Sequence, residues 1–105
     1  MQAFRDRQAE FAKAGAQVLG VSVDPWPAAE AFRKELGCDF PLLGDWPLNR
    51  VGQAYGVYQP DRYVHRRVTF VLDKDHIVRA VIDDPRDMER HAVEALAAVQ
   101  RLAAE

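Results

Sequence analysis

Two places in the sequence carry side chains that could do chemistry. The first is an arginine pair, Arg66 and Arg67, which stands directly before the apolar run 68–72. A guanidinium holds a fixed positive charge and several N–H donors, so it can bind an anion or favour a nearby thiolate. The second is Cys38, the only cysteine, which excludes an intrachain disulfide and a Cys-x-x-Cys redox motif.

The arginine pair belongs to the start of a predicted β-hairpin, Arg67–Ile82. Two runs rich in β-branched and aromatic residues flank a short polar turn from Asp73 to His76. This spacing predicts a type I turn that is closed by His76 in the left-handed region. Side chains alternate along a strand, so the two arginines should leave by opposite faces. We therefore expect one of them to lie among apolar neighbours.

The elements around this hairpin predict one layered α/β domain that covers residues 1–105. The first strand is nearly continuous in apolar residues, which is typical of a strand that is covered on both faces. The expected order is a helix at Met1–Gly15, a strand at Ala16–Asp24, a helix ending at Gly37, an edge strand at Phe40–Gly44, a short helix ending at Gly56, a loop at Val57–Tyr63, the hairpin, and a C-terminal helix capped by Asp87. This is the plan of a thioredoxin-like fold that lacks its N-terminal strands.

Composition excludes several kinds of partner. Basic and acidic residues, 14 and 16 in number, are interspersed and leave a net charge of −2, which argues against nucleic acid or an anionic membrane. No apolar run has the length of a membrane span or of a signal-peptide core, so a cytoplasmic protein is expected.

Metal binding is not expected either. The three histidines, His65, His76 and His91, lack the spacing of a metal site, and we expect them at the surface. The aspartates from position 73 to 84 do not form a calcium loop, because the required glycine would fall on Val78.

Five blocks of sequence, in the right order and spacing, are similar to the peroxiredoxin family of the alkyl hydroperoxide reductase C and thiol-specific antioxidant type. They are Ala16–Asp24 (AQVLGVSVD), Phe32–Leu36 (FRKEL), Asp39–Asp45 (DFPLLGD), Ala54–Tyr58 (AYGVY) and Arg67–Asp73 (RVTFVLD). The resemblance covers essentially all of this chain but only about the later two-thirds of a family domain. It implies a thiol peroxidase that reduces hydrogen peroxide or organic hydroperoxides without a cofactor.

The resemblance assigns the family's active-site arginine to Arg67, which would hold the peroxide oxygens and favour a cysteine thiolate. The family's Pro-x-x-x-Thr-x-x-Cys motif does not occur in these 105 residues, so we expect the chain to be inactive alone. Cys38 has three possible roles: a small buried hydrophobe, which we favour, a resolving or regulatory thiol, or a relocated nucleophile. Asp39 beside it disfavours the thiolate.

Residues 1–15 resemble the remainder of the helix that carries the family's nucleophile. This helix starts without a capping residue, and we expect an incomplete chain, through a misplaced start or a truncated gene. The resemblance also implies a thiol reductant of the thioredoxin, mycothiol or glutathione type, and a homodimer. Trp26 and Trp46 are then core or interface residues. The alternative is a catalytically inactive interaction domain that pairs with itself or with a full-length peroxiredoxin.

Overall fold

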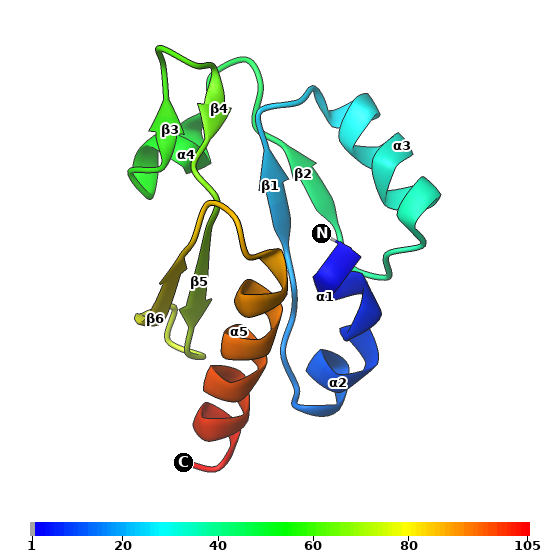
Figure 1. The fold of residues 1–105 in the computed structure, drawn as a ribbon, viewed down its shortest axis with the longest axis vertical. Coiled ribbons are helices and arrows are strands. Elements are labelled where there is room, and N and C mark those ends of the chain that lie inside the picture. The colour runs from blue at the N-terminus through cyan, green and yellow to red at the C-terminus, as the bar shows by residue number, and fades with distance from the viewer. Residues whose placement is uncertain (1) are drawn as a thin grey trace. The chain divides into compact units, whose positions relative to one another are not determined.

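The computed structural model describes residues 2–105, which form two compact units (Figure 1). The hairpin–helix unit consists of residues 2–17 and Arg67–Glu105. The crossover unit consists of Val18–Arg66. Met1, the first residue of the predicted N-terminal helix, lies outside the described residues. The single domain that the sequence predicts stays a prediction.

The hairpin–helix unit contains the predicted β-hairpin. Strands β5 (Val68–Leu72) and β6 (Val78–Asp83) are antiparallel, with a register shift after Val71. The turn confirms the prediction, because His76 has a φ of 64° and its N–H donates to the Asp73 carbonyl over 2.9 Å. One side-chain oxygen, Asp73 Oδ1, also accepts the N–H groups of Asp75 and Ile77, which stabilises the turn.

Helix α5 (Met88–Ala103) packs along this hairpin (Figure 1). It begins as predicted, because the Asp87 side chain accepts the N–H of Arg90 over 3.0 Å. Its buried face consists mainly of small residues, which allow a close approach to the strands. The buried residues of the helix are His91, Ala92, Ala95, Leu96 and Ala98.

The predicted N-terminal helix is divided in two. Helices α1 (Gln2–Asp6) and α2 (Gln8–Lys13) are separated by Arg7, whose φ of −116° and ψ of 14° are not helical. The guanidinium of Arg7 forms an ion pair with Glu89 on α5. Phe4 and Phe11 stack with ring centroids 5.4 Å apart, and Phe11 is buried. In the divided helix, the two rings stack on each other and Arg7 pairs with α5.

The crossover unit begins with a parallel strand pair. Strands β1 (Gly20–Ser22) and β2 (Leu42–Gly44) are connected by helix α3 (Trp26–Leu36), which ends at Gly37 with a φ of 70°. The predicted first strand was too long, and the expectation that both its faces are covered was wrong, since the Leu19 side chain before β1 is 56% exposed. Only Gly20, Val21 and Ser22 of the run remain in the strand.

The remainder of the crossover unit differs from the predicted loop. Helix α4 (Arg50–Ala54) is followed by strands β3 (Tyr58–Gln59) and β4 (Val64–His65), which pair antiparallel. The loop predicted at Val57–Tyr63 therefore contains a strand and a tight turn. Tyr63 takes a left-handed φ of 56° in that turn. A glycine is the usual residue at such a position, and its absence hid the turn in the sequence.

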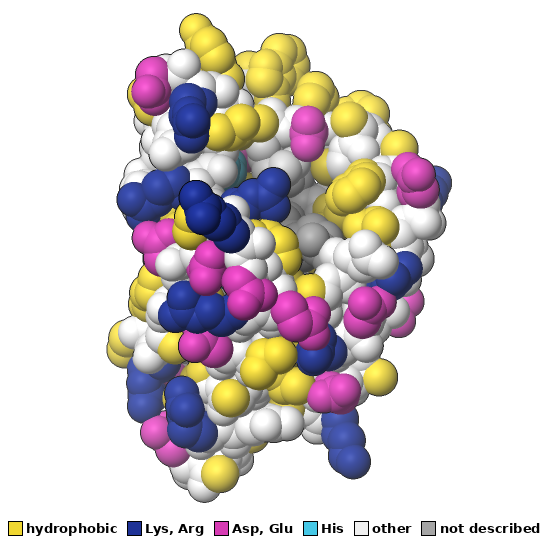
Figure 2. Space-filling model, in the orientation of Figure 1, with side chains coloured by type: hydrophobic (Ala, Val, Ile, Leu, Met, Phe, Trp, Pro, Cys, Tyr) yellow, Lys and Arg dark blue, Asp and Glu magenta, His cyan; other side chains and the backbone are white. Residues whose placement is uncertain are grey.

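Charged side chains of both signs lie on the face that is drawn in Figure 2. On the face that Figure 2 shows, basic and acidic groups are intermingled and neither sign forms a continuous stripe. No helix within residues 2–105 has the length and apolar character needed to cross a membrane.

Candidate functional site

Arg67 lies directly before β5, at the start of the hairpin. Both arginines of the pair are exposed, so the expectation that one of them lies among apolar neighbours was wrong. The reason is that the ladder begins only at Val68, and the strict alternation of faces does not extend back to the pair. The Arg66 N–H instead donates to the Val57 carbonyl over 2.7 Å, within the crossover unit.

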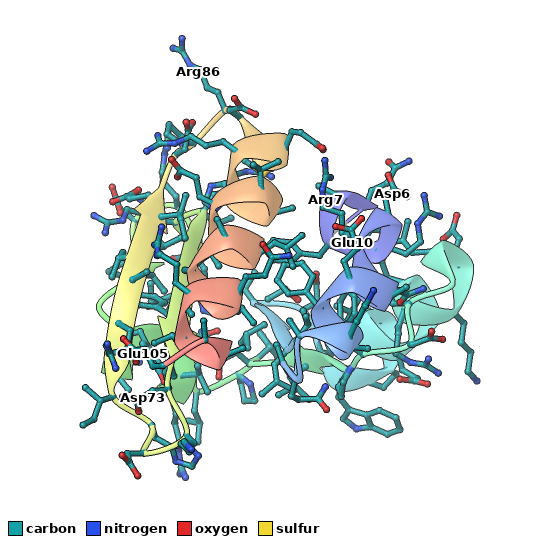
Figure 3. The ribbon with its side chains drawn as sticks, turned by 90° about the horizontal axis from the view of Figure 1, so that it is seen from below. Asp6, Arg7, Glu10, Asp73, Arg86 and Glu105 are labelled. Carbon is teal, nitrogen blue, oxygen red and sulfur yellow. The ribbon has the colours of Figure 1, made fainter. Side chains whose placement is uncertain are left out.

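Among the described residues, the Arg67 guanidinium contacts a sulfur and no carboxylate. Its Nη1 donates to Sδ of Met88, at the first position of α5, over 3.2 Å. Within residues 2–105 Arg67 forms no ion pair, like Arg86 and Arg101 of the same unit, whereas carboxylates neutralise four others, namely Arg5, Arg7, Arg79 and Arg90. Arg79, for example, pairs with Asp73 and Glu105, whose side chains lie at the same end of the unit in Figure 3. Most of the Arg67 donors are therefore available to a ligand.

The loop before α5 fixes the position of Met88. The carboxylate of Asp84 accepts the N–H groups of Arg86 and Asp87 over 2.9 and 3.0 Å, and Arg90 Nη1 donates to it over 3.1 Å. The two backbone donors, together with Arg90, lower the pKa of Asp84 to about 2. The start of α5 is thus tied down by an ionised side chain as well as by its N-cap.

A buried histidine lies behind this loop, in a network that the sequence analysis missed. His91 is 4% exposed, so the expectation that it lies at the surface was wrong. Its Nε2 lies 2.7 Å from the Asp84 carbonyl and its Nδ1 lies 2.9 Å from Thr69 Oγ1. A carbonyl only accepts, so Nε2 carries a proton and, in the neutral ring, Nδ1 accepts from the Thr69 hydroxyl.

Helical periodicity could have revealed this network. His91 stands four residues before Ala95, on the face of α5 that faces the hairpin. Thr69 follows Arg67 by two residues, and the network joins β5 to α5 and to the Asp84 carbonyl in the loop before that helix. Because His91 is buried, the network suits a structural role.

Cys38 lies in the crossover unit, directly after the Gly37 helix stop. It is 2% exposed and forms no disulfide. Its N–H donates to the Arg33 carbonyl over 3.1 Å, and Arg33 Nη1 donates to its carbonyl over 2.9 Å. Cys38 and Arg67 belong to different units.

A second polar cluster lies in the crossover unit. The Asp45 carboxylate accepts the N–H groups of Val51 and Gly52 over 3.2 and 2.8 Å. His65 Nε2 lies 3.2 Å from Asp45 Oδ2 but is not aligned as a hydrogen bond, and both side chains are at most 10% exposed. The cluster thus holds β4 near the start of α4, and its burial suits a structural role.

A cavity lies beside this cluster. It measures about 460 Å³ and is lined by Gly52, Gln53, Gly56, Tyr58 and Pro60. This lining offers one phenol and one side-chain amide but no carboxylate, amine or thiol, so the cavity holds no catalytic set. Across residues 2–105, no three His, Cys, Asp or Glu side chains gather closely enough to hold a metal ion.

The hairpin–helix unit therefore offers one arrangement that could take part in a reaction. It is the exposed Arg67 guanidinium beside the Met88 thioether at the start of α5. The guanidinium can bind and polarise an anion or a peroxide through charge-assisted hydrogen bonds. It supplies no nucleophilic thiolate of its own.

Known proteins are similar to this chain in sequence and in fold. The model of the AhpC/TSA family matches residues 1–81. Alkyl hydroperoxide reductase E of Mycobacterium tuberculosis is 37% identical over 99 residues, which are 90% of this chain and 65% of that protein. The chloroplastic peroxiredoxin Q of Sedum lineare is 38% identical over 102 residues, 95% of this chain and 54% of that protein.

Solved structures agree with these relatives. The crystal structure of the peroxidoxin BcpB from Mycobacterium tuberculosis superposes with a TM-score of 0.86 at 34% identity, and the match covers 95% of this chain and 66% of that one. The Xanthomonas campestris bacterioferritin comigratory protein gives 0.84 at 30% identity, over 97% and 68% of the two chains. The chain spans between about half and two thirds of its curated relatives' length. It has a partial thioredoxin-like fold of the peroxiredoxin type, and it belongs to the AhpC/TSA family.

Proposed function

We propose that this chain supplies the peroxide-binding arginine of a thiol peroxidase, and that Arg67 is that residue. The guanidinium donates hydrogen bonds to the peroxide oxygens, while a cysteine thiolate from outside these 105 residues attacks the nearer oxygen. The O–O bond breaks, the sulfur becomes a sulfenic acid, and the leaving oxygen takes a proton and departs as water or an alcohol. A thiol reductant then returns the sulfenic acid to the thiol.

The observation that carries this proposal is the state of the Arg67 guanidinium. It is exposed, it stands at the position that the family blocks assign to the active-site arginine, and its neighbour is a neutral sulfur. A carboxylate partner would neutralise it and occupy its donors, as happens to Arg79 and Arg90 in the same unit. Its charge is therefore available to stabilise the thiolate and the leaving oxygen.

We assign Cys38 a packing role. Its burial and the helix stop around it support that role, because a peroxide cannot reach a sulfur that solvent does not reach. A resolving or regulatory role would require the segment around Gly37 to open first.

We also propose a cytoplasmic location, because the cytoplasm suits a protein that has to be regenerated by thiols.

A second candidate function is an interaction domain that is not catalytic. Two tryptophans of the crossover unit support it, because Trp26 is 71% exposed and Trp46 is 60% exposed. Large exposed aromatics are typical of protein interfaces. A homodimer, or a pair with a full-length peroxiredoxin, would cover them.

The experiment measures peroxide consumption with a thiol reductant by the 105-residue chain, by its Cys38→Ser variant and by an extended chain. The extended chain carries, ahead of residue 1, the segment of M. tuberculosis alkyl hydroperoxide reductase E that precedes the part resembled by residues 1–15. We expect turnover by the extended chain alone. Turnover by the 105-residue chain that is lost in Cys38→Ser would make Cys38 the nucleophile. A folded but inactive extended chain would favour the interaction domain.

A further inference from the structure

Met88 has a position that the proposed peroxide binding leaves unexplained. Its sulfur accepts an N–H from Arg67 over 3.2 Å, which is short for a hydrogen bond to a thioether. A thioether sulfur has two lone pairs, so one remains to attack an electrophile. The electrophile that Arg67 would bind is a peroxide, whose oxygen would lie within reach of this sulfur.

The contact is held by the fold and does not depend on a flexible side chain alone. Met88 is the first residue of α5, next to the Asp87 N-cap and the Asp84 loop. Glu89, the next residue, is paired with Arg7. Because the start of the helix is fixed from both sides, the thioether is kept close to the guanidinium and pays little ordering entropy when a peroxide arrives.

We propose that Met88 is a modification site at which a peroxide bound by Arg67 oxidises the thioether to a sulfoxide. This inference rests on the proposed peroxide binding. The sulfur lone pair attacks one peroxide oxygen, an S–O bond forms and the O–O bond breaks. The proton of the transferred oxygen passes to the leaving oxygen, which departs as water or an alcohol. The sulfur loses two electrons and the peroxide gains them.

Arg67 contributes in two ways. Its N–H groups orient the peroxide and stabilise the negative charge that develops on the leaving oxygen. After the reaction, the sulfoxide oxygen is a far better acceptor than the thioether sulfur, so it binds the same guanidinium more strongly. Oxidised Met88 would thus occupy the donors that peroxide needs, and a sulfoxide reductase would free them.

The test follows Met88 oxidation in the 105-residue chain exposed to hydrogen peroxide or tert-butyl hydroperoxide. Peptide mass spectrometry measures the gain of one oxygen on the Met88 peptide over time. Arg67→Gln removes the guanidinium. Arg86→Gln is the matched control, since it removes the same charge from a side chain that projects away from the unit (Figure 3). The wild-type chain in denaturant gives the intrinsic rate of a solvated thioether.

We expect Met88 in the folded wild-type chain and in Arg86→Gln to react about tenfold or more faster than in Arg67→Gln. Tenfold is about the lower end of what one charge-assisted hydrogen bond contributes. It should also react faster than in denaturant. Equal or faster oxidation in Arg67→Gln would overturn the proposal, because the contact would then protect the sulfur. Peroxidase turnover of the extended chain that depends on Arg67, combined with Met88 oxidation that does not, would overturn this inference and leave the proposed function standing.

Discussion

The hydrogen bond between Thr69 and His91 is a sharp test of how the support behind Arg67 works. Thr69→Val keeps the shape of the side chain and removes the hydroxyl that lies 2.9 Å from His91 Nδ1. His91 is 4% exposed, so its ring has little access to water that would replace the lost partner. An unsatisfied buried polar atom costs about 1–3 kcal/mol, and we expect the free energy of unfolding to fall by that amount.

Thermal and urea unfolding, followed by circular dichroism, measure the effect. Each kcal/mol corresponds to roughly 4–8 °C in melting temperature for a unit of this size. The control is the same substitution in a His91→Leu background, where no imidazole nitrogen is left to be unsatisfied and Thr69→Val should be nearly neutral. A loss below about 0.5 kcal/mol in the wild-type background, or an equal loss in both, would refute the reasoning.

Two other predictions concern the crossover unit and the loop before α5. Gly44→Ala should destabilise the protein by about 1–3 kcal/mol, because its new Cβ would lie 2.6 Å from the Trp26 backbone nitrogen; Leu43→Ala, on the same strand but 44% exposed, is the control in the same unfolding assay. For Asp84, whose pKa is lowered from 3.8 to about 2, the stabilisation is complete above the unfolded pKa and is lost as the pH falls towards about 2. Urea midpoints of Asp84→Asn should therefore fall less than those of the wild-type chain between neutral pH and about pH 3. The same fall of the midpoint with pH in both chains would contradict the role given to the Asp84 carboxylate.

Local signals predicted the hairpin and the final helix well. The turn from Asp73 to His76, the left-handed His76 and the Asp87 cap depend on neighbours in sequence, and the structure confirms them. The regular spacing of apolar residues did not predict where the N-terminal helix is interrupted. The break at Arg7 goes with an ion pair to Glu89, a residue far away in the sequence, which no local pattern contains.

The candidate site was predictable in part. The family blocks pointed to Arg67, but its exposure and its contact with Met88 depend on where the ladder starts and on how α5 is placed. The burial of His91 was within reach of the helical spacing and was missed because the histidines were considered only as metal ligands. The small hairpin around Tyr63 was missed because the left-handed residue is not a glycine.

The central claim is that Arg67 binds the peroxide, and kcat/KM of the extended chain tests it most directly. Arg67→Gln should lower kcat/KM for peroxide by about 10²–10³, the effect of removing one group that stabilises developing charge. The kcat/KM of Arg67→Lys should lie between those of the parent and Arg67→Gln, since an ammonium keeps the charge but cannot donate two parallel hydrogen bonds as a guanidinium does. Arg86→Gln should match the parent. An Arg67→Gln variant as active as Arg86→Gln would contradict the account.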